Sequence, residues 1–170
     1  METSDTFCVV APMIANHWEE VAAIYEAGIA TKQATFETKA PSWETWDLAH
    51  RKDCRLVALM EDQIVGWAAL SNVSGRCVYA GVAEVSIYIK ADYRGKGIGD
   101  LLMETLIRES EGNGIWTLQA GIFPENMASL RLHHKHGFRT LGIKERIGKM
   151  EDTWRDVAQL ERRSSIAGMD

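Results

Sequence analysis

The chain has 170 residues, a formal net charge of -5, 46% apolar residues and 25% charged residues. This is the composition of a soluble globular protein with one sizeable core. A negative balance disfavours broad nucleic-acid binding, and no apolar run is long enough to span a membrane. We therefore expect a single domain over 1–170, with its core at about 7–162, and neither nucleic acid nor membrane as a partner.

The three cysteines, Cys8, Cys54 and Cys77, are an odd and scattered set. They form no disulfide framework and no metal-ligand spacing, which predicts a reducing, cytoplasmic location and no metal site. The acidic stretch Met1–Asp5 precedes no apolar run, so no secretory signal peptide is expected.

Hydrophobic periodicity and turn residues predict the element order βααβββαβαββ. Asn16 and Ser42 are the expected caps of the first two helices, and residues 164–170 are expected to be frayed. The predicted strands are 7–10, 55–60, 64–70, 83–90, 115–122, 138–145 and 154–161, and the predicted helices 17–29, 43–52, 100–112 and 127–135. This order predicts an α/β domain with helices on both faces of one sheet.

A glycine-rich stretch, Arg94–Gly99, joins the fourth predicted strand to the third predicted helix. Its three glycines let several backbone N–H groups point to one spot, the helix start adds a positive dipole end, and Arg94 and Lys96 add charge. The pattern predicts a phosphate-binding turn, with an ordinary tight turn as the alternative. It is not a P-loop, because no Gly-Lys-Ser/Thr ends it. It is not a dinucleotide fingerprint, because Asp100 stands where a glycine is needed.

Two motifs together resemble the GNAT superfamily of acyl-CoA-dependent N-acetyltransferases. Arg94–Gly99 is similar to the pyrophosphate motif Gln/Arg-x-x-Gly-x-Gly/Ala, and Asn126–Ser129, followed by His133 and Gly137-Phe138, is similar to the Asn-x-x-Ala/Ser helix. Further segments resemble the phosphinothricin N-acetyltransferase group, whose members also act on methionine sulfoximine, methionine sulfone and arsinothricin. These segments are Ala34–Thr38, Gly66–Ala68, Ala83–Ile89 and Trp154–Val157.

The resemblance implies a fold, a co-substrate and its contacts. The fold is the GNAT fold, an α/β (α+β) architecture with a mostly antiparallel sheet, helices on both faces, and fourth and fifth strands that splay apart. The co-substrate is acetyl-CoA, with its pyrophosphate on the glycine turn and its pantetheine on the strand before it. The implied contacts are Ile87, Tyr88, Ile89, Arg94, Gly95, Lys96, Gly97, Ile98, Gly99, Asp100, Asn126 and Ser129.

The resemblance and the chemistry of amine acetylation indicate two catalytic candidates. An amine attacks a thioester only when neutral, and a reference α-amino pKa of about 7.7–8.0 leaves much of it protonated. Glu84, on an apolar strand that can raise a carboxyl pKa, is the candidate general base, and a structural ion pair is its alternative. His133 stands where most GNAT members have a tyrosine proposed to protonate the leaving thiolate. It either donates that proton or only contacts the cofactor, whereas His134 and His136 are expected on the surface.

A glutamate-like substrate also needs a cation for its carboxylate. Arg76 is the first candidate, because a guanidinium binds a carboxylate bidentately, and Lys149 and Arg146 come second. For the aromatic candidates, core packing is the alternative. The expected substrate-binding residues are Phe36, Arg76, Tyr79, Ser86, Lys149 and Trp154.

The sequence therefore predicts a homodimeric, acetyl-CoA-dependent N-acetyltransferase that acetylates the α-amino group of a small amino-acid analogue by direct transfer. The expected substrates are of the phosphinothricin, methionine sulfoximine/sulfone or arsinothricin type. One alternative is a GNAT enzyme acting on protein N-termini or polyamines, which the loop Ala34–Thr38 and Arg76 disfavour. The other is a non-catalytic acyl-CoA sensor, which the presence of Glu84 disfavours.

Overall fold

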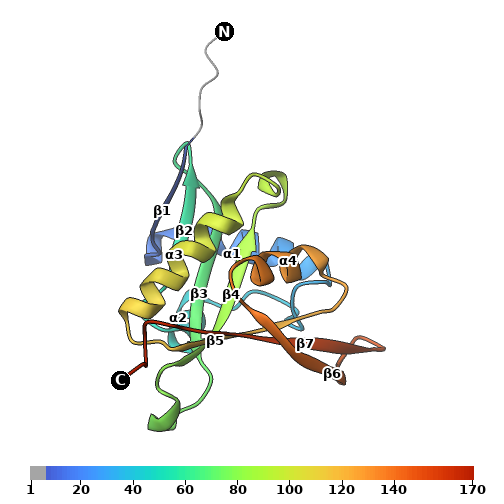
Figure 1. Ribbon diagram of the computed structural model, residues 1–170. Coiled ribbons are helices and arrows are strands. Elements are labelled where there is room, and N and C mark those ends of the chain that lie inside the picture. Colours follow the sequence, from blue (N-terminus) through green and yellow to red (C-terminus); the bar gives the residue numbers. More distant parts are fainter. Residues whose placement is uncertain (1–6) are drawn as a thin grey trace.

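The computed structural model describes residues 7–170, so the acidic stretch Met1–Asp5 lies outside the described residues. The strands form one sheet in the order β1-β2-β3-β4-β5-β7-β6 (Figure 1). They are β1 (Cys8–Pro12), β2 (Leu56–Met60), β3 (Gln63–Asn72), β4 (Val82–Ile89), β5 (Thr117–Ile122), β6 (Arg139–Met150) and β7 (Thr153–Arg163). The α-helices are α1 (Trp18–Ala30), α2 (Trp43–Ala49), α3 (Ile98–Gly112) and α4 (Met127–Lys135). The predicted element order is confirmed, and no helix among the described residues could cross a membrane.

The sheet is antiparallel except between β4 and β5. Those two strands pair only from Val82 opposite Thr117 to Glu84 opposite Gln119. Beyond Glu84 they separate, as the resemblance implies. Among the described strands, none therefore pairs with Val85–Ile89 on the β5 side. This opening in the middle of the sheet positions the candidate site.

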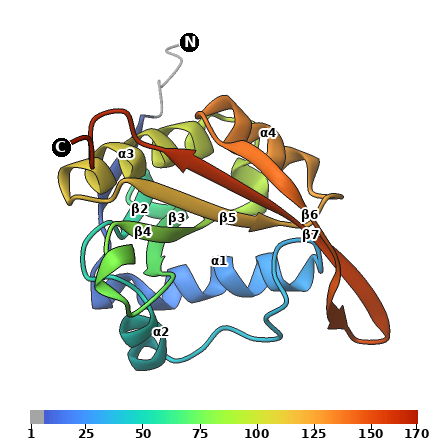
Figure 2. The same cartoon turned by 60° about the horizontal axis from the view of Figure 1, so that its bottom comes forward.

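Helices cover both faces of the sheet, with α3 and α4 on one face and α1 and α2 on the other (Figure 2). Alternation along β4 sends neighbouring side chains to opposite faces. Val85 and Ile87 belong to the core under α3, whereas Tyr88 packs with Val21 and Trp67 under α1. The same alternation places Glu84 and Ser86 on the α1 face.

Aromatic rings stiffen the α1 face next to these polar residues. Trp67 and Tyr88 are register partners on β3 and β4, and their rings stack with centroids 5.0 Å apart. Trp46 of α2 is buried against Trp67 and stacks on His50 at 4.0 Å. Interlocked rings of this size leave little freedom for the strand that carries Glu84.

The helix starts agree with the sequence only in part. Ser42 caps α2 as predicted, accepting a hydrogen bond from the Thr45 amide at 3.2 Å. Asn16 does not cap α1, because it lies inside a 3-10 turn whose start is held by the Ile14 amide donating to His17 Nδ1 at 3.1 Å. The third helix begins at Ile98, earlier than the predicted Asp100, because Gly97 (φ 80°) turns the backbone directly into it.

The last hairpin is longer than predicted. Its turn is Glu151–Asp152 rather than 148–153, because β6 is almost wholly exposed and carries little hydrophobic alternation. The prediction of a frayed tail over 164–170 is also wrong. Arg163 Nη1 donates to the carbonyls of Ser164 and Ala167 at 2.8 and 2.9 Å, and Nη2 donates to that of Gly168 at 2.7 Å.

Candidate active site

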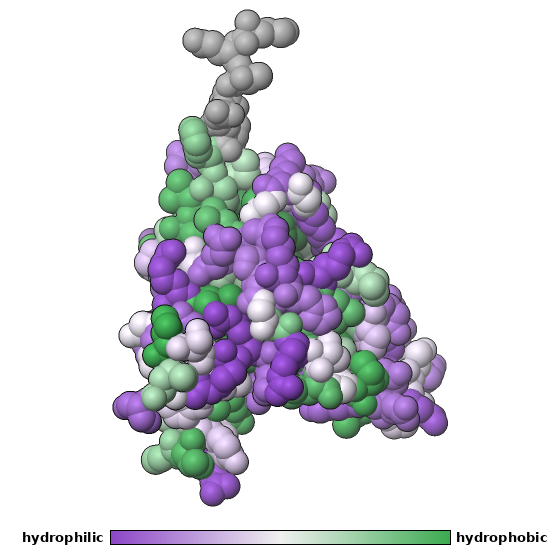
Figure 3. Space-filling model, viewed as in Figure 1, coloured by the Kyte–Doolittle hydropathy of each residue, from purple (hydrophilic) through white to green (hydrophobic). Residues whose placement is uncertain are grey.

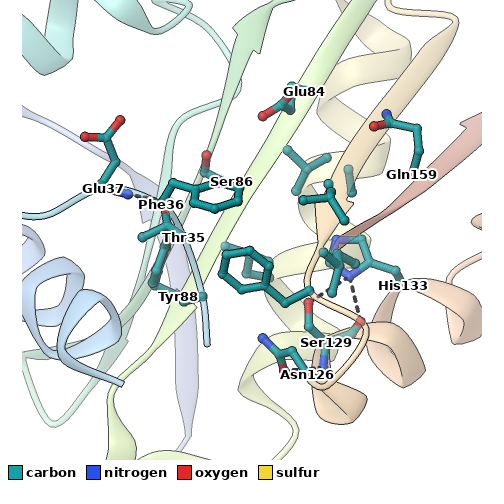
Figure 4. Close-up of a pocket in the computed structure, with 18 of the residues that line it drawn as sticks. Thr35, Phe36, Glu37, Glu84, Ser86, Tyr88, Asn126, Ser129, His133 and Gln159 are labelled. Carbon is teal, nitrogen blue, oxygen red and sulfur yellow. Dashed lines mark hydrogen bonds between the residues drawn. The ribbon is translucent and has the colours of Figure 1, made fainter. Parts of the chain in front are cut away.

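Two adjoining cavities open where β4 and β5 separate. The Glu84 cavity, of about 560 Å³, lies between β4 and β5 (Figure 4). The glycine-turn cavity, of about 430 Å³, lies at the start of α3. Residues that line both are Ala34, Ile87, Tyr88, Asn126 and Ser129. Two molecules bound in the two cavities would therefore meet beside β4.

The glycine-turn cavity is built for close backbone approach. Gly95 and Gly97 have φ of 74° and 80°, and a Cβ on either would meet no atom within 4 Å. The residues at the start of α3 line the cavity, and the first N–H groups of a helix have no partner within the helix, an arrangement that binds anions. Lys96 lies over the Tyr93 ring at 5.1 Å rather than lining the cavity. The other residues predicted to contact acetyl-CoA line it together: Ile87, Tyr88, Ile89, Arg94, Gly95, Gly97, Ile98, Gly99, Asp100, Asn126 and Ser129.

Asp100 ties the start of α3 to the end of α4. Its Oδ1 lies 2.8 Å from His136 Nε2, and its Oδ2 lies 3.0 Å from Lys135 Nζ. These two partners hold the pKa of Asp100 below its usual range. The prediction that His136 is a surface residue is wrong, because contact with Asp100 leaves its side chain 9% exposed, whereas His134 is exposed as expected.

Glu84 stands at the last position of β4 that pairs with β5, and it lies opposite Ser71 of β3. Its side chain reaches solvent through the cavity, yet desolvation by the surrounding protein raises the pKa of its carboxyl. The ammonium of Lys144 acts in the opposite direction. Among the described residues Glu84 makes no ion pair within 4.0 Å, so the predicted structural ion pair is not seen. A carboxylate with a raised pKa beside a cavity has the properties of a general base.

His133 faces the same cavity from α4, across from Glu84 and Ser86 (Figure 4). Only 2% of it is exposed, and its Nδ1 lies 2.8 Å from the Ser129 carbonyl oxygen. Because a carbonyl can only accept, Nδ1 carries the proton and Nε2 of the neutral ring is an acceptor. Burial lowers the pKa of His133, despite the opposing effect of the Ser129 bond.

Residues 31–37, here called the strap, run from α1 across the opening in the sheet. Arg155 of β7 holds the strap, its Nη1 donating to the Lys32 carbonyl at 2.8 Å and its Nη2 to Gln33 Oε1 at 3.0 Å. Asn126 Nδ2 donates to the Gln33 carbonyl at 3.1 Å, and Phe36 packs edge-on against Phe123 at 5.0 Å. The predicted loop is thus fixed to the β5 and β7 side of the opening.

The structure divides the predicted substrate residues into two groups. Phe36 and Ser86 line the Glu84 cavity. The other four line neither cavity: Arg76 lies over the Tyr79 ring at 5.6 Å, and Lys149 lies 5.8 Å from the Trp154 ring. Their contact with a substrate stays a prediction.

Several residues that line the Glu84 cavity were not predicted. On β7, Val157 and Gln159 line it, whereas Ala158 and Leu160 are buried in the core on the other side. This alternation along β7 could have been used to predict which of its residues face the cavity. The remaining unpredicted polar or charged residues lie in loops, on an exposed strand or at the end of another strand, and carry no such pattern: Thr35, Glu37, His50, Ser71 and Lys144.

Comparison with known proteins identifies the family. The model of the acetyltransferase (GNAT) family matches residues 18–138. The chain belongs to the GNAT family of acetyltransferases. YwnH of Bacillus subtilis is 35% identical over 153 residues, which cover 86% of this chain and 93% of YwnH. A phosphinothricin N-acetyltransferase of Streptomyces coelicolor is 30% identical over 161 residues, 90% and 94% of the two chains. The structure of a Sinorhizobium meliloti phosphinothricin acetyltransferase in complex with acetyl-CoA matches with a TM-score of 0.85, at 26% identity, over 96% of this chain and 91% of that one.

Proposed function

We propose that this GNAT acetyltransferase transfers the acetyl group of acetyl-CoA directly to the α-amino group of a small amino-acid analogue, of the phosphinothricin, methionine sulfoximine/sulfone or arsinothricin type. The observation that carries the proposal is the pair of cavities meeting beside β4. One has an anion-binding turn and the other a carboxylate of raised pKa. The names of the relatives support the choice of substrate class.

The glycine-turn cavity fits the proposed co-substrate. Amides from Gly95 to Asp100 would bind the pyrophosphate, and the open space beside Gly97 leaves room for that approach. The stretch Val85–Ile89 pairs with β3 and is open on its β5 side, where its backbone would hold the pantetheine by hydrogen bonds in the manner of an added strand. Acetyl-CoA supplies the acyl thioester when bound. The side-chain amide of Asn126 already donates one hydrogen bond to the Gln33 carbonyl and accepts one from the Ser129 amide. A hydrogen bond to the pantetheine would use its second N–H or the second lone pair of its oxygen.

Glu84 would take the proton from the substrate ammonium, directly or through a water. Both Glu84 and Glu37 line the cavity, and two carboxylates attract a cationic amine. The neutral tautomer of His133 presents Nε2 as an acceptor. A role as proton donor to the thiolate therefore requires His133 to be protonated at Nε2 first, whereas a contact role does not.

We also propose that the enzyme acts as a homodimer that pairs through the β6–β7 hairpin. Apolar side chains reach the surface there, and Figure 3 shows green patches in this region of a largely polar face. Leu141, Ile143, Ile147 and Trp154 are each about half exposed, at 47%, 50%, 57% and 50%. Light scattering of the purified protein measures the assembly, and a monomer at micromolar concentration would contradict this proposal.

A turnover screen with acetyl-CoA tests the proposed function. The amines are phosphinothricin, methionine sulfoximine, methionine sulfone, polyamines and N-terminal peptides. Loss of thioester absorbance is the preferred readout, because the exposed Cys77 thiol would consume a thiol reagent. We expect turnover with the amino-acid analogues. Turnover of peptides or polyamines alone would replace the proposed substrate class, and binding of acetyl-CoA without turnover of any amine would indicate a sensor.

A further inference from the structure

The Glu84 cavity has an uneven set of charged and titratable side chains. Glu37 and Glu84 supply two carboxylates, and His50 and His133 both have a pKa lowered by burial. Among the described residues that line the cavity, the only lysine or arginine is Lys144. An amino-acid substrate brings a carboxylate as well as an amine, and a carboxylate leaves water readily only when it gains a cation or strong donors.

A bulge in β6 presents Lys144 to the cavity. The pairing of β6 with β7 shifts register between Lys144 and Gly148, and Arg146 has a φ of 46°. Asp156 of β7 holds the bulge, because its Oδ1 accepts the Arg146 amide at 2.7 Å. Such bulges redirect side chains beside functional sites. Lys144, its register partner Val157 and Ile147 of the bulge all line the cavity.

The Lys144 ammonium is available to a ligand. Lys144 is exposed, and no described residue forms a hydrogen bond or an ion pair with its side chain. It nevertheless lies close enough to Glu84 to lower the pKa of that carboxyl. The cation and the candidate base therefore face one cavity, on strands β6 and β4.

We propose that Lys144 binds the α-carboxylate of the amino-acid substrate and thereby directs its amine toward Glu84. This rests on the proposed function, and it gives the carboxylate a partner other than Arg76, which lines neither cavity. A carboxylate on Lys144 would also offset the effect of that ammonium on Glu84. The substrate carboxylate would thereby favour transfer of the amine's proton to Glu84.

The test compares methionine sulfone with its methyl ester, which keeps the amine and the sulfone but lacks the negative charge. In Lys144→Met, KM for methionine sulfone should rise roughly tenfold, the value of one charge-assisted hydrogen bond at a partly exposed site. KM for the ester should be unchanged in Lys144→Met. Lys144→Arg should retain most of the wild-type preference for the acid over the ester. Lys39→Met, a lysine that lines neither cavity, is the matched control. An unchanged KM for acetyl-CoA shows that each variant is folded.

Two results would overturn the assignment of Lys144. One is a wild-type KM for methionine sulfone in Lys144→Met, and the other is an equal rise for the acid and the ester. Failure of the proposed function looks different, because the wild-type enzyme would then acetylate neither compound.

Discussion

At the scale of single residues, the proposed chemistry depends on Glu84. The side chain lies where β4 leaves β5, so one side faces protein and the other faces the cavity. Desolvation favours the neutral carboxyl, which raises its pKa toward that of the amine it would deprotonate. A base of higher pKa accepts a proton more readily, provided that it is ionised at the working pH.

Glu84→Gln keeps the shape of the side chain and removes the base. We expect kcat to fall by about 10²–10⁴-fold, the usual contribution of a general base, with KM for acetyl-CoA unchanged. In the wild type, log kcat/KM should be level between the pKa of the amine and that of Glu84 and fall with slope one below the pKa of Glu84, because ionised Glu84 accepts the proton of the ammonium. In the variant the fall of slope one should begin already at the pKa of the amine, because only amine that is neutral in solution can then react. Glu104→Gln on the exposed side of α3 is the control, and a wild-type profile in Glu84→Gln would remove Glu84 from the mechanism.

At the scale of elements, the glycine turn and the strap line the two cavities in which we propose that the two substrates bind. The turn was predictable from sequence because its function depends on consecutive residues and local backbone geometry. The anchoring of the strap was not, because Arg155 lies far along the chain from Lys32 and Gln33. Lys144 was missed for a related reason, since a bulge held by Asp156 sets its direction and an exposed strand carries no hydrophobic pattern.

Gly97→Ala tests the turn. Its φ of 80° disfavours any side chain, so we expect a loss of about 1–2 kcal/mol in the free energy of unfolding. KM for acetyl-CoA should rise as well, because the methyl group intrudes where the phosphate approaches the backbone. Gly112→Ala is the matched control. Gly112 does not have a positive φ, and a Cβ there would also meet no atom within 4 Å. Chemical denaturation and initial rates measure both effects, and equal behaviour of the two variants would place the phosphate elsewhere.

Arg155→Met tests the strap. The guanidinium is largely buried, lies 4.0 Å from the Phe123 ring centroid and bonds the strap twice. We expect KM for both substrates to rise by roughly tenfold, because charge-assisted bonds of this kind contribute about 1.5–3 kcal/mol, with faster tryptic cleavage within the strap. Lys32→Met removes an ion pair to Glu151 that is 59% and 69% exposed. Such pairs contribute little, so its kinetics should be near wild type. Similar kinetic effects of Arg155→Met and Lys32→Met would contradict the expectation that the Arg155 contacts matter more for the strap.

At the scale of the whole molecule, the order of elements and the family could be read from sequence, because apolar periodicity and two local motifs carry them. The cavity walls could not, since they form only when β7, β6 and the strap meet β4. Arg76 shows the difference. Its residue type suits a carboxylate, but its position relative to the cavities depends on the fold, which places its guanidinium over Tyr79 and outside both cavities, so its contact with a substrate stays a prediction.

Protonation of buried histidines should limit stability in mild acid. His50 and His133 have pKa values lowered by burial, so the unfolded chain binds more protons below its ordinary histidine pKa of about 6.5. Stability is therefore present above that pH and is lost as pH falls below it. The pKa of Asp47 is lowered, so its protonation reduces stability only in stronger acid. We expect Tm to decrease between pH 7.5 and 5.5, less so in His133→Asn than in the control His134→Asn. Parallel curves would contradict this origin.

The gap between β4 and β5 lowers the stability of the sheet but is required for the proposed activity. Pairing of Val85–Ile89 with β5 would complete the sheet and satisfy the backbone groups on that side of β4. That same pairing would occupy the backbone proposed to hold the pantetheine. Selection for a more stable protein would thus favour changes that close the gap, and those changes would abolish catalysis. The most productive positions for stabilising this enzyme accordingly lie away from the middle of its sheet.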